Sequence, residues 1–187
     1  MDAFTSVFSA FGLASAAGLN AYLPLLVVAL TARFTHLIQL NEPWNALTSW
    51  WVIGVLAVLL LIEMTVDKIP AVDTINDVVN TAIRPIAGAI LFTASSGAVG
   101  EVHPVLAIIC GLLVAGGVHA VKATARPAVT ATTGGLGNWL VSLLEDMVSF
   151  ITTVLAILVP ALLILLLLLA ILSLAWWRIR CRTRYAR

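Results

Sequence analysis

Charged residues are scarce in this sequence. Only 10% of its 187 residues are Asp, Glu, Lys or Arg, whereas 61% are hydrophobic. A soluble domain carries about 25% charged and about 45–50% apolar residues, so a soluble fold of this size is excluded. A membrane-spanning helix needs roughly 20 residues. The chain therefore has room for five or six helices and for no catalytic domain outside the membrane.

Cysteines and catalytic motifs are equally sparse. The two cysteines, Cys110 and Cys181, argue against a disulfide framework. The sequence contains no Gly-x-Ser-x-Gly, no Gly-x-x-x-x-Gly-Lys, no His-Glu-x-x-His and no Cys-x-x-Cys, the signatures of hydrolases, nucleotide-binding loops, zinc peptidases and thiol redox sites. We therefore expect no enzyme, no cofactor and no metal centre. Any transport must run down a gradient or with a coupled ion. The N-terminus also lacks the features of a removable signal peptide.

The apolar stretches predict an all-α integral membrane protein, a small bundle of five to six transmembrane or re-entrant helices in one domain, residues 1–177. The first stretch, about residues 5–33, is longer than one span requires. It contains Gly18, Asn20 and Pro24, which predict a broken or tightly packed helix.

Prolines suggest further helix boundaries. Pro70 ends the second apolar stretch, 50–66, because the residue before a proline disfavours helical geometry. Residues 71–84 then form a short polar helix, and a third span begins at Pro85. The fourth span covers about 105–124.

Five arginines occupy the last ten residues. A basic tail, 178–187, directly after an apolar run indicates a cytoplasmic C-terminus under the positive-inside rule. For a bacterial source, this predicts a multi-pass protein of the plasma (inner) membrane. No basic domain accompanies the tail, so nucleic acid is not an expected partner.

Residues 12–21 and 111–120 resemble one another. Small residues match at a constant offset, Gly12 with Gly111, Ala16 with Ala115 and Gly18 with Gly117, and we expect all six to be packing positions. Composition alone also makes small residues recur in membrane helices. On a five-span count the two segments run antiparallel, which predicts an inverted repeat with halves 5–100 and 101–177. That count puts several basic residues on the outer side, against the positive-inside trend, and so also suggests re-entrant segments.

Ionisable residues recur at helical spacing in the middle of the chain. Each one buried in a bilayer costs at least ~2.5–3.5 kcal/mol on insertion scales, so such residues pair or face a water-filled cavity. Three pairs lie four residues apart and share a helix face: Glu63 with Asp67, Asp73 with Asp77, and Lys122 with Arg126. The basic pair could serve as partner to the acidic pairs across the bundle.

Three functional hypotheses remain open. The favoured one is a small secondary transporter or lipid flippase for an anionic or amphiphilic substrate, with proton coupling as an option. Its substrate-binding residues would be Asn20, Tyr22, Arg84, His119, Lys122 and Arg126. Its ion-coupling or counter-charge residues would be Glu63, Asp67, Asp73, Asp77, Glu145 and Asp146.

The alternatives use the same charges differently. Four carboxylates, at positions 63, 67, 73 and 77, could line an ion or metal pathway, since hard divalent cations prefer oxygen ligands. The charges could also merely hold together a non-transporting scaffold or partner subunit. Membrane lipids and a small anionic or lipid substrate are the expected partners, and a homo-oligomer is left open.

Several motifs together resemble a bacterial family of small integral membrane proteins catalogued as a domain of unknown function (number 4126). They are Gly18-Leu-Asn-Ala-Tyr-Leu-Pro24, Glu63 with Asp67-Lys-Ile-Pro70 and Asp73, Arg84-Pro-x-x-Gly88, and His119-x-x-Lys122 with Arg126. The resemblance extends to about Pro160 and implies no activity. In layout the chain also resembles small bacterial lipid-carrier transporters with re-entrant hairpins, a likeness that no motif supports residue by residue.

Overall fold

The protein is seen in a computed structural model that describes residues 3–66, 70–96, 102–134 and 137–159. These residues form helices and no strand. Three helices are long and apolar enough to cross a membrane: Val78–Ser95, Pro104–Thr133 and Asn138–Val159. The prediction of an all-α membrane bundle is therefore confirmed. The basic tail lies outside the described residues.

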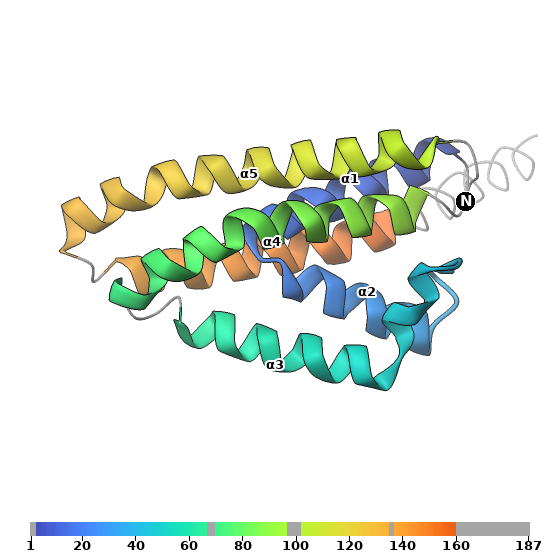
Figure 1. The fold of residues 1–187 in the computed structure, drawn as a ribbon, viewed down its shortest axis with the longest axis horizontal. Coiled ribbons are helices and arrows are strands. Elements are labelled where there is room, and N and C mark those ends of the chain that lie inside the picture. Colours follow the sequence, from blue (N-terminus) through green and yellow to red (C-terminus); the bar gives the residue numbers. More distant parts are fainter. Residues whose placement is uncertain (1–2, 67–69, 97–101, 135–136, 160–187) are drawn as a thin grey trace, which may run out of the picture.

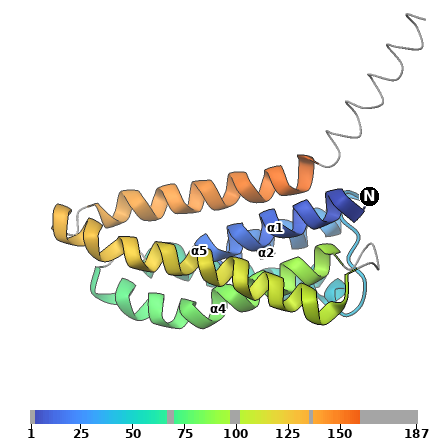
Figure 2. The ribbon, with the colours of Figure 1, turned by 90° about the horizontal axis from the view of Figure 1, so that it is seen from above.

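The helices run back and forth along one long axis (Figure 1). In chain order they are α1 (Ala3–Leu19), α2 (Tyr22–Phe34), the 3-10 helix η1 (Trp44–Thr48), α3 (Trp50–Val66), α4 (Pro70–Ser96), α5 (Pro104–Thr133) and the Asn138–Val159 helix. The main bundle consists of α1, α4, α5 and the Asn138–Val159 helix. α3 lies at its edge, packed mainly against α2 (Figures 1 and 2).

α1 and α2 form a hairpin that enters the bundle and turns back. α2 returns toward the end at which α1 begins (Figures 1 and 2). α1 has 17 residues and α2 has 13, whereas α5 has 30. At about 1.5 Å per residue, the arms are about 25 and 20 Å long beside a helix of about 45 Å. Gly18, near the tip, packs against Ala115 and Val118, which places the tip level with the middle of α5. This is the shape expected of a re-entrant segment.

The side chain of Asn20 explains why the helix breaks where it does. Its Oδ1 accepts hydrogen bonds from the backbone N–H groups of Tyr22, at 3.1 Å, and Leu23, at 3.0 Å. Both donors belong to the first turn of α2, where they have no intrahelical acceptor. Pro24, which follows, lacks an N–H group and is tolerated in a first turn. The predicted break is confirmed.

Small residues let α1, α4 and α5 approach closely. A Cβ atom added at Gly18 would lie 2.6 Å from the carbonyl oxygen of Ala115, and one at Gly88 would overlap the Ala115 Cβ. Gly111 faces the backbone of Gly88 in the same way. Such contacts supply the dispersion energy that holds membrane helices together. Packing roles are confirmed for Gly12, Ala16, Gly18, Gly111 and Ala115. The prediction for Gly117 is wrong, since it is exposed and a Cβ there would meet nothing within 4 Å.

The two similar segments run parallel. Ala10 and Ala14 pack near Ala107, and further along both helices Gly18 meets Ala115. The antiparallel arrangement that an inverted repeat requires is therefore wrong for them. The reason is the hairpin: the stretch counted as one span forms two antiparallel helices, α1 and α2, which reverses the direction expected for α5 (Figure 1).

Two helices continue through prolines, one of which, Pro85, is the expected start of the third span. Pro85 lies inside α4 and Pro127 lies inside α5. A proline in a helix interior removes one hydrogen bond and frees the carbonyl four residues earlier. Membrane helices tolerate this because neighbouring helices and side chains satisfy the freed group. The expected stop near Pro70 is confirmed, since α3 ends at Val66 and α4 begins at Pro70.

Candidate functional site

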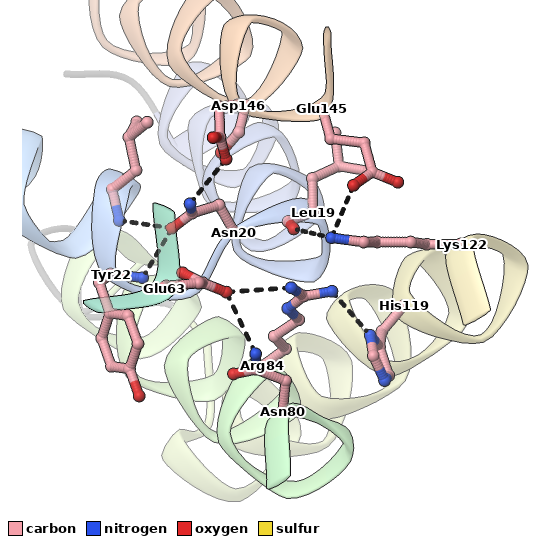
Figure 3. Close-up of polar contacts among 12 residues, drawn as sticks. Leu19, Asn20, Tyr22, Glu63, Asn80, Arg84, His119, Lys122, Glu145 and Asp146 are labelled. Carbon is pink, nitrogen blue, oxygen red and sulfur yellow. Dashed lines mark hydrogen bonds and ion pairs between the residues drawn. The ribbon is translucent and has the colours of Figure 1, made fainter. Parts of the chain in front are cut away.

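Charged and amide side chains gather where the hairpin tip meets the surrounding helices (Figure 3). The Arg84 cluster consists of Glu63, Asn80, Thr81, Arg84 and His119. The Lys122 cluster consists of Asn20, Lys122, Arg126, Glu145 and Asp146. Most of these side chains are buried, with Arg84 0% and Lys122 6% exposed. Such burial in an apolar bundle requires that the charges be paired and hydrogen-bonded.

The Arg84 cluster ties α3 to α4 through a buried ion pair. Arg84 donates from one guanidinium nitrogen to Glu63 Oε1 at 2.9 Å, and the two side chains are 0% and 1% exposed. Asn80 donates from Nδ2 to the same Glu63 oxygen at 3.3 Å. Glu63 is the one charged residue among the buried residues of α3. This pair therefore anchors an otherwise apolar edge helix to the main bundle.

His119 extends the Arg84 cluster to α5. Its Nδ1 lies 3.0 Å from the second terminal nitrogen of Arg84, and its Nε2 lies 3.1 Å from Thr81 Oγ1. A guanidinium can only donate, so Nδ1 must accept this bond. The proton of the neutral ring then sits on Nε2 and faces the Thr81 hydroxyl. The imidazole thus links one helix to the other without adding a charge.

The Lys122 cluster joins two cations to one carboxylate oxygen. Glu145 Oε2 lies 2.8 Å from Lys122 Nζ and 3.1 Å from an Arg126 guanidinium nitrogen. Lys122 Nζ also donates to the backbone carbonyl of Leu19 at 3.1 Å. Leu19 ends α1, where unsatisfied carbonyls carry the negative end of the helix dipole. Lys122 therefore serves both the hairpin tip and Glu145.

Asn20 links the hairpin tip to the Asn138–Val159 helix. While its oxygen caps α2, its Nδ2 donates to Asp146 Oδ1 at 2.9 Å. Ser149, on the same face of that helix, donates to the carbonyl oxygen of Ala16 at 3.0 Å. Tip and helix are thus joined at two successive turns, which explains how a broken helix is held inside the bundle.

Residue spacing accounts for the convergence of these side chains. His119, Lys122 and Arg126 are three and four residues apart, so they share one face of α5. Asn80 and Arg84 are likewise four residues apart on α4. The charged face of α5 meets α4 at His119 and the Asn138–Val159 helix at Lys122 and Arg126.

The structure brings together most of the predicted site residues. Eight converge: Asn20, Glu63, Arg84, His119, Lys122, Arg126, Glu145 and Asp146. Tyr22 is half-buried, and Figure 3 shows its ring turned away from Lys122 and Glu145. Asp67 lies outside the described residues, as do the side chains of Asp73 and Asp77, whose backbone belongs to α4.

The described side chains show two ion-pair partners. Glu63 pairs with Arg84, and the basic pair Lys122 and Arg126 meets Glu145, because the Asn138–Val159 helix supplies a carboxylate level with it. Pairing of the basic pair with the acidic side chains at 67, 73 and 77 stays a prediction, since these side chains lie outside the described part. Arg84, Lys122 and Arg126 are buried, so they are not loop charges and the positive-inside rule does not apply to them.

Sequence analysis missed three parts of the site. Asn80 and Thr81 line the polar face of α4, and the i,i+4 spacing of Asn80 to Arg84 was the available signal. The Leu19 carbonyl gave none, because every residue carries one. No group of three or more His, Cys, Asp or Glu suited to a metal occurs among the described residues. Three of the four carboxylates of the proposed metal pathway lie outside that part.

A small cavity lies apart from both clusters, toward the beginning of α1. Its volume is about 30 Å³ and its polar lining includes the hydroxyls of Ser6, Ser9 and Ser95. Ser6 is 1% exposed, and its hydroxyl has no hydrogen-bond partner among the described residues.

Comparison with known proteins gives one match. A family described as "Domain of unknown function (DUF4126)" matches residues 7–180. This match extends further than the resemblance seen in the motifs. No curated protein and no solved structure matches the chain.

Proposed function

This chain belongs to the DUF4126 family, a domain of unknown function, and we propose that it is a small secondary transporter or lipid flippase for an anionic or amphiphilic substrate. The observation that carries this proposal is the position of the hairpin tip. The end of α1 and the residue Asn20 before α2 meet buried Lys122 and half-buried Asp146 at mid-bundle. Interrupted helices whose ends face charged groups near the midplane are typical of transporter binding sites.

The energetic argument points the same way. Lys122 and Arg126 are 6% and 7% exposed, in the interior of a bundle whose outer faces are apolar. A purely structural bundle needs no charge there, and apolar residues of similar volume often stabilise a protein as well as a buried ion pair does. Intramembrane cations are therefore a functional hypothesis by default. Lys and Arg together favour a phosphate or carboxylate group.

The proposed topology follows from the hairpin. α3, α4, α5 and the Asn138–Val159 helix cross the membrane, and α1 with α2 enters and leaves on one side. The start of α1 and the end of the Asn138–Val159 helix lie at the same end of the bundle (Figures 1 and 2). The basic tail, which lies outside the described residues, would face the cytoplasm across the plasma membrane.

A scaffold function is the second candidate, and one observation favours it. In the described residues the three cations Arg84, Lys122 and Arg126 meet carboxylates at 2.8–3.1 Å. Such a network could hold five helices together with no ligand at all.

Ligand retention separates the two candidates. Wild type and Lys122→Ala/Arg126→Ala would be released from nanodiscs of mixed zwitterionic and anionic lipids into a native mass spectrometer. The transporter proposal expects an anionic lipid or metabolite bound to the wild type and lost from the variant. Arg33→Ala, which removes a cation stacked on Trp50 at 4.2 Å, is the matched control and should keep the ligand. Bare wild-type protein, or equal retention by the double variant, would contradict the proposal and favour the scaffold.

A further inference from the structure

We propose that the part of the bundle beyond the hairpin tip is a water-filled vestibule, which leads from one membrane surface to the Lys122 cluster. The part around the hairpin closes the cluster off from the other surface. This inference rests on the transporter function proposed above and deepens it, because it assigns the side from which a substrate reaches the site. The vestibule half consists of residues 57–66, 70–86, 116–134 and 137–149, and the hairpin half consists of the other described residues.

The buried side chains of the two halves differ in kind. In the vestibule half, every described side chain that is buried is polar or charged. These side chains are Glu63, Asn80, Arg84, His119, Lys122, Arg126, Asn138, Ser142 and Ser149. The hairpin half has an apolar core, in which Leu13, Leu91 and Phe92 are buried. A roomy interior lined by polar groups holds water, whereas an apolar interior stays dry.

The outer face of the vestibule half is apolar. Val78 and Val121 are each 70% exposed, and Leu144 is 57% exposed. The helices of this half therefore turn apolar side chains outward and polar side chains inward. Ionisable residues of membrane helices have this arrangement where they face a water-filled cavity.

Polar contacts mark a course from the end of the bundle to the hairpin tip. Near the end of α5, Thr130 Oγ1 lies 3.0 Å from Asn138 Oδ1. One turn earlier, Arg126 meets Glu145 at 3.1 Å, and one turn earlier again, Lys122 donates to a carbonyl oxygen of the tip at 3.1 Å. The three α5 residues are four apart, so the course follows one face of the helix.

A buried donor in the vestibule half supports hydration independently. Arg84 is 0% exposed, and its Nε has no hydrogen-bond partner among the described residues. Its two terminal nitrogens already bond Glu63 and His119. A buried donor without an acceptor costs about 1–3 kcal/mol, and more when it is charged. Water is the usual partner of such a group, and a hydrated vestibule supplies it.

The hairpin half offers no comparable course among its described residues. Three of its buried hydroxyl groups donate to backbone carbonyl oxygens, those of Ser9, Thr93 and Thr153. Gly18 and Gly88 bring the helices so close that an added Cβ would overlap a neighbour. The small cavity beside Ser6 is lined by no residue of either cluster. Water on that side therefore meets a packed apolar core before it reaches the tip.

Cysteine labelling in membrane vesicles tests the proposal. Ser142 and Thr153 are eleven residues apart on one face of the Asn138–Val159 helix, and they are 2% and 0% exposed. Each would be replaced by cysteine in a Cys110→Ser/Cys181→Ser background. A charged, membrane-impermeant methanethiosulfonate would then be added to right-side-out and to inverted vesicles.

We expect Ser142→Cys to react at least about tenfold faster than Thr153→Cys, and from one orientation only. The thiolate is the reacting form, and an apolar surrounding raises the pKa of a thiol; a rise of about one unit lowers the thiolate fraction about tenfold. Leu144→Cys, on the outer face, is the matched control and should stay unmodified. If Ser142→Cys fails to fold, Asn138→Cys replaces it under the same criteria.

Three results would overturn the proposal. Equal rates for Ser142→Cys and Thr153→Cys would show that the vestibule half is no wetter than the apolar core. Modification of Ser142→Cys from both orientations would show that the hairpin half does not close the site. Modification of Leu144→Cys as fast as Ser142→Cys would show that the reagent does not select the interior.

The labelling also separates this inference from the transporter function. Fast labelling at position 142, with wild-type protein that retains no ligand in the native mass spectrometer, keeps the vestibule and refutes the transporter. Slow labelling at position 142, with a ligand retained by wild type, overturns the vestibule and keeps the transporter.

Discussion

The ion pair between Glu63 and Arg84 provides the sharpest test of how the bundle is stabilised. Glu63→Leu leaves the Arg84 guanidinium, 0% exposed, without its carboxylate at 2.9 Å. Removing one partner of a buried ion pair costs about 3–5 kcal/mol, because the other charge stays buried. His119 still accepts one bond from Arg84. We therefore expect the lower end of that range, about 3 kcal/mol, in the free energy of unfolding.

The reciprocal and double variants isolate the interaction. Arg84→Met should lower the free energy of unfolding about as much as Glu63→Leu does. It removes the guanidinium from the buried Glu63 carboxylate, which keeps its hydrogen bond from Asn80. The double variant removes both charges and should be more stable than either single variant. Contacting residues in one network show coupling energies of about 0.5–3 kcal/mol, and we expect a value near the upper end here.

Equilibrium unfolding in detergent micelles would measure these energies through the fluorescence of the six tryptophans. Glu42→Leu, an exposed carboxylate in the loop before η1, is the matched control and should change stability by less than about 0.5 kcal/mol. If the two single substitutions had additive effects on the free energy of unfolding, the pair would not anchor α3. A Glu63→Leu variant as stable as wild type would refute the same reasoning.

Three further predictions concern the packing and the hairpin. Gly88→Ala should destabilise the protein by about 1–3 kcal/mol through overpacking against Ala115, whereas Gly117→Ala should be neutral or stabilising by up to about 1 kcal/mol; equal melting temperatures for the two would contradict the packing assignment. Asn20→Ala should cost about 0.5–2 kcal/mol through the lost cap, and faster hydrogen exchange confined to the first turn of α2 would locate the loss, while unchanged exchange there would show that the cap is dispensable. Ser6→Ala should leave thermal stability unchanged or raised, because it removes a buried hydroxyl without a described partner; a lowered melting temperature would indicate a water bound in the cavity.

Sequence alone predicted the break at Asn20 but not the direction of α2. A short polar side chain beside glycine and proline is typical of a helix cap, and Asn20 caps the first turn of α2. Whether the chain then crosses or turns back depends on the helices around the tip, among them α5, whose Ala115 and Val118 contact Gly18. Local residue patterns do not encode contacts with segments far along the chain.

The charged residues show a similar division. Spacing on α5 placed His119, Lys122 and Arg126 on one face, as observed. Their partners required knowledge of which helix lies opposite, and the Asn138–Val159 helix supplies Glu145 at that level. Pro85 misled for a different reason: its cost in a helix depends on what surrounds the freed carbonyl, which the sequence does not specify.

The hairpin has a consequence for how this protein is made. Its arms have 17 and 13 residues, and the 13-residue arm is clearly shorter than the roughly 20 residues that a span requires. They are synthesised before α4 and α5, whose small residues form the surface against which α1 packs. We therefore expect the hairpin to wait at the membrane surface during translation and to insert after the later helices have assembled, so that a segment synthesised before α4 and α5 reaches its place after them.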